Sequence, residues 1–270
     1  MGAVNSTPAI LWRRLLAEFL GSAFLAVIVI GSGIAAQHLS PGQTGLQLLE
    51  NAAATAAGLF AIILMFGPVS GAHFNPVVSF ADAVFGGLRW REAAAYLPVQ
   101  VAGCIAGAVA ANLMFAQAAV SISTKHRATG AHFFSEVIAT AGLILVIFAL
   151  ARSGRSQSAA AAVGAYIGAA YFFTSSASFA NPAITIGRMF SDTFAGIAPS
   201  SAPSFIVAQV IGGALAVVVT WALYPRLTPQ QAADIIVPHL HGQAGQPGRD
   251  PASDAGVPPA GQPDHQRQPR

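Results

Sequence analysis

The chain has 270 residues, of which 54% are hydrophobic and 9% are charged, whereas about a quarter of the residues of an ordinary soluble domain are charged. This composition excludes a domain that faces water on every side. The formal net charge of +3 is too small to indicate nucleic-acid binding. Cys104 is the only cysteine of the chain, so an internal disulfide is excluded.

Six apolar stretches are each long enough to cross a bilayer, which takes roughly 20 residues. Arg13 and Arg14 precede the first stretch as they would in a signal peptide. This stretch is long and further spans follow it, so we expect it to be retained. The expected spans are residues 12–36, 48–66, 93–115, 133–151, 159–176 and 204–224.

Basic residues near the ends of these spans predict their orientation. Cytoplasmic loops carry the excess of Lys and Arg, and placing both termini in the cytoplasm leaves mainly Lys125, Arg127 and Arg188 outside. We therefore expect a multi-pass protein in the lipid bilayer of the cell (inner or cytoplasmic) membrane, with both termini cytoplasmic. The residues on the inner side are then Arg13, Arg14, Arg89, Arg91, Arg152, Arg155 and Arg226.

Composition divides the chain into a membrane domain, residues 1–225, and a tail, residues 226–270. The tail is rich in Pro, Gly, Gln and Asp and cannot bury enough apolar surface to fold alone, so we expect it to be disordered and cytoplasmic. The two halves of the membrane domain, about residues 10–115 and 130–225, resemble each other. The motifs AEFLGS and SEVIAT open their first spans. Three spans per half require opposite orientations, which predicts an inverted repeat with a site where the halves meet.

Each half also contains a short segment that is too short to cross, with Asn75-Pro76-Val77 in the first half and Asn181-Pro182-Ala183 in the second. Asn is a favoured helix N-cap and Pro a favoured first helical residue, so extended chain should turn abruptly into a short helix at each pair. Non-helical backbone at membrane depth is tolerated only where protein buries it or water lines it. Both loops should therefore border a pore.

The duplicated Asn-Pro motif, the sequence Gly-Ala-His-Phe-Asn-Pro and a glutamate early in the first and fourth spans resemble the major intrinsic protein family over about residues 10–225. The resemblance implies an aquaporin-like channel domain, an all-α membrane protein with six transmembrane helices and two re-entrant half-helices. It also implies a homotetramer with one pore per subunit. Carboxylates inside a membrane invite a transport-relay role, but the resemblance favours Glu18 and Glu136 as supports for the re-entrant loops.

In this family the half-helices meet at the midplane, and their positive ends repel cations and protons. Asn75 and Asn181 would each cap a half-helix and leave an amide N–H pointing into the lumen. The extended stretches before them would present backbone carbonyl oxygens along one wall of the pore. The residues expected to supply these carbonyls are Gly71, Ala72, His73, Phe74, Ala177 and Phe179.

The sequence departs from the family pattern at Val77, where Ala is usual, and at Ile184, where most water and glycerol channels have the arginine of the outer filter. Counting back from the motifs gives the other filter positions as Thr55, Ala169 and Ser178. These residues predict a wide, largely apolar filter without a fixed cation. Arg188 lies one helical turn beyond Ile184, where it either offers a displaced positive charge at the outer mouth or anchors the helix.

The run NPAITIGRMFSDTFAGI, residues 181–197, resembles bacterial aquaglyceroporin-like channels associated with arsenic detoxification. The resemblance implies passive passage of small neutral solutes such as water, glycerol-like polyols and metalloid hydroxides such as arsenite. A water channel, an ion-coupled secondary transporter and a structural protein with a closed pore remain alternatives. No Ser-His-Asp grouping, metal-ligand cluster or phosphate loop stands out, so we expect neither an enzyme nor a metal or cofactor.

Overall fold

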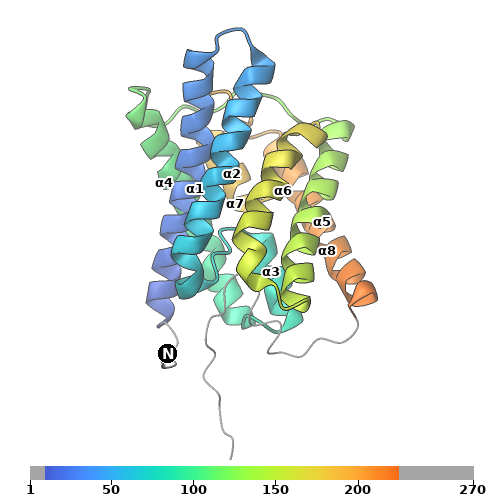
Figure 1. Ribbon diagram of the computed structural model, residues 1–270. Helices are drawn as coiled ribbons and strands as arrows, with labels where there is room; N and C mark the ends of the chain where they lie inside the picture. Colours follow the sequence, from blue (N-terminus) through green and yellow to red (C-terminus); the bar gives the residue numbers. More distant parts are fainter. Residues whose placement is uncertain (1–9, 225–270) are drawn as a thin grey trace, which may run out of the picture.

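A computed structural model describes residues 10–224, and the expected tail, residues 226–270, lies outside the described part. The described chain is helical, and six of its helices run along a common direction as a bundle (Figure 1). Two short helices, α3 (Pro76–Phe85) and α7 (Pro182–Gly187), follow the Asn-Pro pairs. The long helices are α1 (Leu11–Leu39), α2 (Thr44–Ser70), α4 (Trp90–Met114), α5 (Gly130–Arg152), α6 (Ala159–Phe173) and α8 (Ala202–Leu223).

Five of the six expected spans are helices that are long and apolar enough to cross a membrane. Helix α6 is shorter, with 15 residues. A 3-10 turn, η1 (Ser156–Ser158), precedes it, and the chain becomes extended at Thr174. The predicted span ended at residue 176, three residues too late. Residues 174–176 belong to the re-entrant loop, which follows the helix directly.

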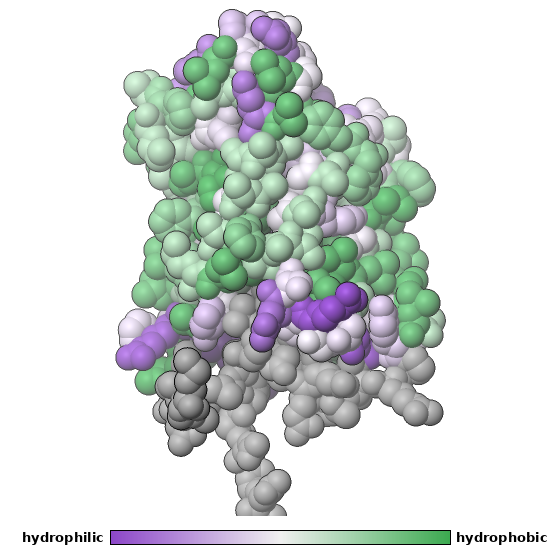
Figure 2. Space-filling view, viewed as in Figure 1, coloured by the Kyte–Doolittle hydropathy of each residue, from purple (hydrophilic) through white to green (hydrophobic). Residues whose placement is uncertain are grey.

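The face of the bundle seen in Figure 2 is mostly hydrophobic, and hydrophilic residues gather at its two ends. Lipid cannot satisfy polar groups, so this distribution fits a protein surrounded by hydrocarbon. Exposed apolar residues come from most of the long helices, among them Phe24, Leu64, Phe134, Phe172, Val210 and Trp221.

Corresponding helices of the two halves pack in the same way, α1 against α4 and α5 against α8. Glycines allow the backbones to approach closely at both contacts. A Cβ atom at Gly107 of α4 would lie 2.2 Å from the carbonyl oxygen of Ala23, and one at Gly212 of α8 would lie 2.4 Å from that of Val137. Backbone atoms cannot give way as a flexible side chain can, so these positions require glycine.

We expect Gly107→Ala to destabilise the bundle, because the added methyl group must push α1 and α4 apart. Overpacking of this kind costs about 1–3 kcal/mol. The measurement is the midpoint temperature for loss of the monodisperse species in detergent.

Gly45→Ala is the matched control, because Gly45 is also helical and a Cβ atom there would meet nothing within 4 Å. Equal midpoint temperatures for the two variants would contradict the close contact between α1 and α4.

Candidate functional site

Both short helices begin with an asparagine cap. The side-chain oxygen of Asn75 accepts a hydrogen bond from the backbone N–H of Val77 at 3.0 Å. In the second half, the oxygen of Asn181 accepts from the N–H groups of Ala183 and Ile184 at 2.9 and 3.3 Å. Proline follows each asparagine as the first helical residue, where its missing N–H costs nothing. The paired motif is therefore a pair of helix starts.

The same asparagines tie the two loops together. The amide nitrogen of Asn75 donates to the carbonyl oxygen of Ala180 at 2.8 Å, and that of Asn181 donates to the carbonyl oxygen of Phe74 at 2.7 Å. Each amide has two N–H groups, so one is used in the tie while both side chains still line the cavity. The expectation that each asparagine leaves an amide N–H for the lumen therefore stays a prediction about the second N–H group, and the carbonyl of Phe74 already has a donor.

The backbone of both loops is held in an unusual conformation. Positive φ angles occur at five non-glycine residues, Ala72, Phe74, Ala177, Ser178 and Ala180, with values from 45° to 59°. This left-handed region is uncommon for residues with a side chain, and such strain persists only where the surroundings fix it. The loops therefore need strong partners, and the buried glutamates supply them.

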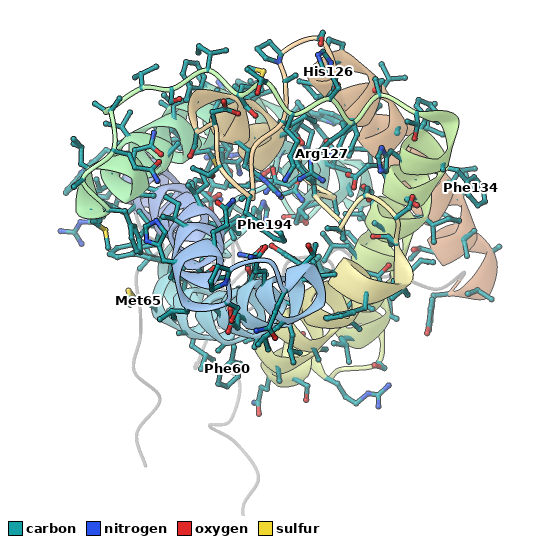
Figure 3. All side chains as sticks on the ribbon, turned by 90° about the horizontal axis from the view of Figure 1, so that it is seen from above. Phe60, Met65, His126, Arg127, Phe134 and Phe194 are labelled. Carbon is teal, nitrogen blue, oxygen red and sulfur yellow. The ribbon has the colours of Figure 1, made fainter. Side chains whose placement is uncertain are left out.

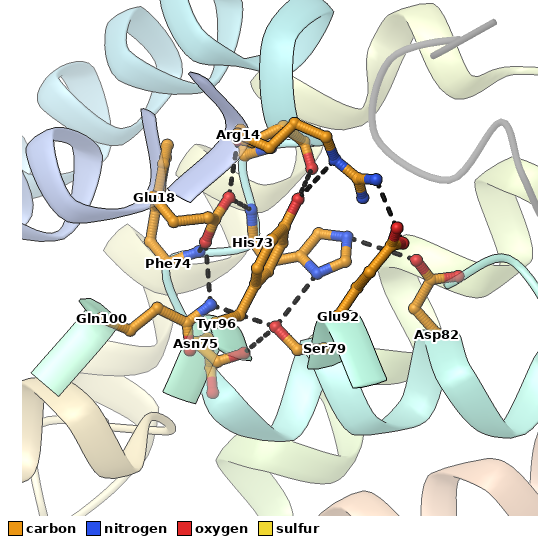
Figure 4. Close-up of polar contacts among 12 residues, drawn as sticks. Arg14, Glu18, His73, Phe74, Asn75, Ser79, Asp82, Glu92, Tyr96 and Gln100 are labelled. Atoms are coloured by element: carbon orange, nitrogen blue, oxygen red, sulfur yellow. Dashed lines mark hydrogen bonds and ion pairs between the residues drawn. The ribbon is translucent and has the colours of Figure 1, made fainter. Parts of the chain in front are cut away.

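Glu18 is completely buried and holds the first loop with four donors (Figure 4). One carboxylate oxygen accepts from the hydroxyl of Ser70 at 2.6 Å and the N–H of His73 at 3.0 Å. The other accepts from the N–H of Phe74 and the amide of Gln100, both at 2.8 Å. Charge-assisted bonds of this kind are the strong ones, so the carboxylate both fixes the loop and is itself satisfied.

Glu136 repeats this arrangement in the second loop. It accepts from the hydroxyl of Ser176 at 2.6 Å, from the N–H groups of Phe179 and Ala180 at 2.9 and 2.8 Å, and from the amide of Gln209 at 2.7 Å. Sequence reasoning missed Gln209 and its counterpart in the first half. Aligning the third span of each half would have found the two glutamines, because they occupy equivalent places in the repeat.

The ring of His73 braces the first loop. Its Nδ1 atom lies 3.1 Å from the hydroxyl of Ser79, and its Nε2 atom lies 3.4 Å from a carboxylate oxygen of Asp82 (Figure 4). The edge of the ring packs against Tyr96, whose hydroxyl donates to the carbonyl of Ser70. The imidazole thus contacts side chains of α3 and α4, which fits a bracing role.

A cavity of about 60 Å³ lies between the halves, room for several waters at roughly 10–15 Å³ each. Apolar side chains from α1, α2, α5 and α6 form one wall, and the two loops form the other. The expected site residues that line it are Thr55, Ala72, His73, Phe74, Asn75, Ser178, Phe179, Asn181, Ile184 and Arg188. Those outside the lining are Gly71, Pro76, Val77, Ala169, Ala177, Pro182, Ala183 and the two loop supports, Glu18 and Glu136.

The prediction that Ala169 belongs to the filter is wrong. Ala169 is exposed on α6, two residues and hence about 200° around the helix from Ile167, which lines the cavity. Tyr171 also lines the cavity, and its hydroxyl lies 3.1 Å from that of Thr55. A count of residues back from the motif does not show which face of α6 lines the cavity, and this face carries Ile167 and Tyr171. Tyr171 makes the filter narrower and more polar than expected.

Arg188 corrects the expectation of a filter without a fixed cation. It lines the cavity with only 2% of its surface exposed. Its Nε atom donates to the carbonyl of Ala195, and its guanidinium carbon lies 3.4 Å from the ring centre of Phe179. The charge therefore faces the pore while the same side chain holds the outer loop, so the two proposed roles are not exclusive.

The loop of residues 116–129 crosses the end of the bundle opposite the start of α1 (Figure 1), and this end of the pore is called the outer mouth. The N–H of Ser123 donates to the carbonyl of Met189 at 2.9 Å, and that of Ala198 donates to the carbonyl of Lys125 at 2.8 Å. Arg127 points toward the middle of the molecule (Figure 3) and donates to the carbonyl of Gly196 at 2.9 Å. Burial, together with the nearby arginines, lowers the pKa of Lys125 to about 8. The outer mouth is thus rich in positive charge.

Val77, the departure in the first motif, packs against α8 and not into the cavity. A Cβ atom at Gly213 would lie 2.3 Å from a Cγ atom of Val77, and Val77 is buried outside the cavity lining. The extra bulk of valine, compared with the usual alanine, is thus accommodated by a glycine on α8. The pore at the motif is not narrowed by the valine side chain.

This contact predicts that Gly213→Ala destabilises the protein, because the stiff valine side chain cannot rotate away. Combining it with Val77→Ala should restore much of the loss, with a coupling of about 0.5–3 kcal/mol. Midpoint temperatures of the two single variants and the double variant in detergent measure this coupling. Strictly additive effects would mean that the two side chains do not compete for the same space.

A polar wall and an apolar wall that enclose a cavity between two opposed half-helices, inside a bundle with an apolar exterior, define a transmembrane channel. The family model described as "Major intrinsic protein" matches residues 5–180. The chain belongs to this family, which is a family of channels and not of enzymes.

Similar proteins agree with this assignment. The chain is 44% identical over 216 residues to "Aquaglyceroporin AqpS" of Rhizobium meliloti, covering 80% of this chain and 92% of that protein. It is 30% identical over 240 residues to "Lens fiber major intrinsic protein" of Rattus norvegicus, covering 80% and 83%. The fold matches the structure of the aquaglyceroporin from Plasmodium falciparum with a TM-score of 0.62 and 22% identity, covering 80% of this chain and 98% of that one.

Proposed function

We propose that this channel passes small uncharged polyols and metalloid hydroxides down their gradients, with glycerol and arsenite as the candidate solutes beside water. The single observation that carries the proposal is the division of the cavity into a polar wall and an apolar wall. A polyol has hydroxyl groups that can exchange water for carbonyl and hydroxyl partners, and a carbon face that suits the apolar wall. Undissociated arsenite resembles a compact polyol in its hydrogen bonding.

The filter supplies the polar partners for such a solute. Three hydroxyl-bearing residues, Thr55, Tyr171 and Ser178, come from different segments and line the same cavity. The Ser178 hydroxyl is buried and has no hydrogen-bond partner within residues 10–224. An unpaired buried hydroxyl costs free energy, and a rotation about χ1 that turns it toward the cavity would let a passing solute hydroxyl remove that cost. The resemblance of residues 181–197 to channels associated with arsenic detoxification supports the metalloid candidates.

Two observations favour a passive pore over an ion-coupled transporter. Glu18 and Glu136, the carboxylates buried beside the loops, each accept from four donors of the loops and neighbouring helices, so their oxygens are occupied and are not free to bind a transported ion. In addition, the cavity lining contains no Asp or Glu among the described residues. A water-selective channel is the second candidate, and it is favoured by the narrowing that Tyr171 and Arg188 cause.

We place the channel in the cytoplasmic membrane as a homotetramer with both termini inside. The start of α1 and the end of α8 lie at the same end of the bundle (Figure 1). The positive-inside rule assigns this end to the cytoplasm, because the described basic residues close to the start of α1, the start of α4 and the end of α5 are Arg13, Arg14, Arg89, Arg91, Arg152 and Arg155. Native mass spectrometry from detergent tests the tetramer, and protease access to the C-terminal tail in sealed inside-out vesicles tests the orientation.

Stopped-flow light scattering on proteoliposomes tests the solutes directly. We expect osmotic water flux and rapid glycerol entry, and arsenite uptake that does not depend on a proton or sodium gradient. Liposomes without protein set the background. Water flux without glycerol or arsenite entry would favour the water-selective candidate, and uptake driven by an ion gradient would overturn the passive mechanism.

Ile184→Arg should narrow the filter, because a long cationic side chain replaces a short apolar one in the cavity lining. We expect glycerol and arsenite flux to fall by at least roughly tenfold, which corresponds to about 1.4 kcal/mol, while water still passes. Ile184→Val is the control, since it keeps the position apolar. Unchanged glycerol flux in Ile184→Arg would show that position 184 does not border the narrow part of the pore.

A further inference from the structure

Arg188 lies in the pore at a place where the family pattern puts no cation. It begins the 3-10 turn η2 (Arg188–Phe190), one turn beyond Ile184, and it lines the cavity together with Ile184 and Ser178. The position that usually carries the filter arginine is therefore apolar, while a guanidinium group enters the same cavity from the next helical turn.

The guanidinium group of Arg188 is fixed at one edge. Its Nε atom donates to the carbonyl of Ala195, and its plane lies over the ring of Phe179. That ring is itself held, because Phe205 packs edge-on against it at 4.9 Å and the N–H of Phe179 donates to Glu136 at 2.9 Å. The side chain of Arg188 therefore has a defined position and cannot sweep out of the pore without losing these contacts.

The other edge of the guanidinium group is available. Within residues 10–224, the Arg188 side chain makes a single hydrogen bond, from Nε to the carbonyl of Ala195. The two Nη atoms have no hydrogen-bond partner there, and neither is fully enclosed by protein. The two Nη atoms thus reach open space, which is the cavity that Arg188 lines. Ser178 lines the same cavity. Its hydroxyl is enclosed and unpartnered among the described residues, and a rotation about χ1 would turn this donor and acceptor toward the cavity.

A second arginine strengthens the positive potential at this level. The guanidinium carbon of Arg127 lies 5.4 Å from the same Phe179 ring, and its nitrogens donate to the carbonyls of Gly196 and Phe194 at 2.9 and 3.2 Å. Glu136 interacts electrostatically with both arginines, so two positive charges face one negative charge. Charges in a partly buried site interact more strongly than in water, and the net positive potential opposes the entry of cations.

From this geometry we propose that Arg188 is the cation of the selectivity filter, and that with Ser178 it forms a subsite that binds the hydroxyl groups of a neutral solute and excludes cations. The solute half of this inference rests on the proposed function. The cation barrier does not, because a water-selective pore would need the same barrier.

Two charge-removing variants and one charge-retaining variant test the barrier. Arg188→Met removes the charge and every donor, Arg188→Gln removes the charge but keeps an N–H group for Ala195, and Arg188→Lys keeps the charge. Proteoliposomes contain an entrapped pH-sensitive dye, and a potassium gradient with valinomycin sets the membrane potential. We expect the Met and Gln variants to admit protons at least roughly tenfold faster than wild type, a loss of about 1.4 kcal/mol of barrier, and the Lys variant to remain close to wild type.

Lys125→Met is the matched control. It removes another cation of the outer mouth that also donates to a carbonyl of the outer loop, that of Phe194, but Lys125 does not line the cavity. Its proton leak should equal that of wild type. A monodisperse profile in detergent and retained water flux show which variants are folded.

Glycerol flux tests the binding half. The concentration that half-saturates glycerol flux should rise several-fold in Arg188→Gln and in Ser178→Ala, whereas proton leak should rise only in the first. If the wild-type channel carries water but no glycerol, the proposed solute is wrong. The cation barrier is still tested in that case, by the proton leak of the Arg188 variants compared with wild type.

If Arg188 only braced the outer loop, removing its charge would change neither the proton leak nor the half-saturating glycerol concentration. Folded Arg188→Gln with wild-type proton leak and wild-type half-saturation would overturn the proposal, because the brace to Ala195 would then account for the residue. If Arg188→Met does not fold, the Gln variant alone decides. The double variant Arg188→Met with Ile184→Arg should restore low proton leak, since it returns a guanidinium group to the pore one turn deeper.

Discussion

The structure depends on two carboxylates that satisfy backbone N–H groups inside a membrane. Lipid offers no hydrogen-bond partner, so an extended loop at membrane depth must find its partners within the protein. Glu18 and Glu136 meet this requirement with four donors each. A buried charge is itself costly unless it is fully hydrogen-bonded, so the carboxylate and the strained loop stabilise each other. This mutual dependence explains why the loops can keep left-handed residues such as Ala72 and Ser178.

The Asn-Pro pairs then join the halves. Each asparagine caps its own half-helix and donates to a carbonyl of the opposite loop, so neither half-helix can shift alone. The helix starts, with their partial positive charges, are thereby fixed face to face across the cavity. Above them, Arg188 adds a full charge at the outer end of the pore. Solutes thus meet positive potential at two levels, while the apolar wall supplied by four helices stays the same.

Features set by local chemistry could be predicted from the sequence, and features set by the path of the loops could not. An Asn-Pro pair specifies a helix start wherever it lies, so α3 and α7 were found, whereas the role of Glu18 and Glu136 as loop supports came from the resemblance to the major intrinsic protein family. The assignment of Ala169 failed because a count along the chain cannot tell which face of α6 turns inward. The long side chain of Arg188 can reach either the vestibule or the pore, and only the ring of Phe179 and the carbonyl of Ala195 decide between them.

Helix α6 has a consequence for the membrane itself. Its 15 residues rise about 22 Å, less than the roughly 30 Å thickness of the hydrocarbon core. A bilayer that touched this helix along its whole length would have to thin locally, which costs elastic energy. A neighbouring protein in the same place would not have to thin, so this elastic cost would be absent. The face of α6 is therefore the side of the channel where hydrophobic mismatch favours contact with another protein over contact with lipid.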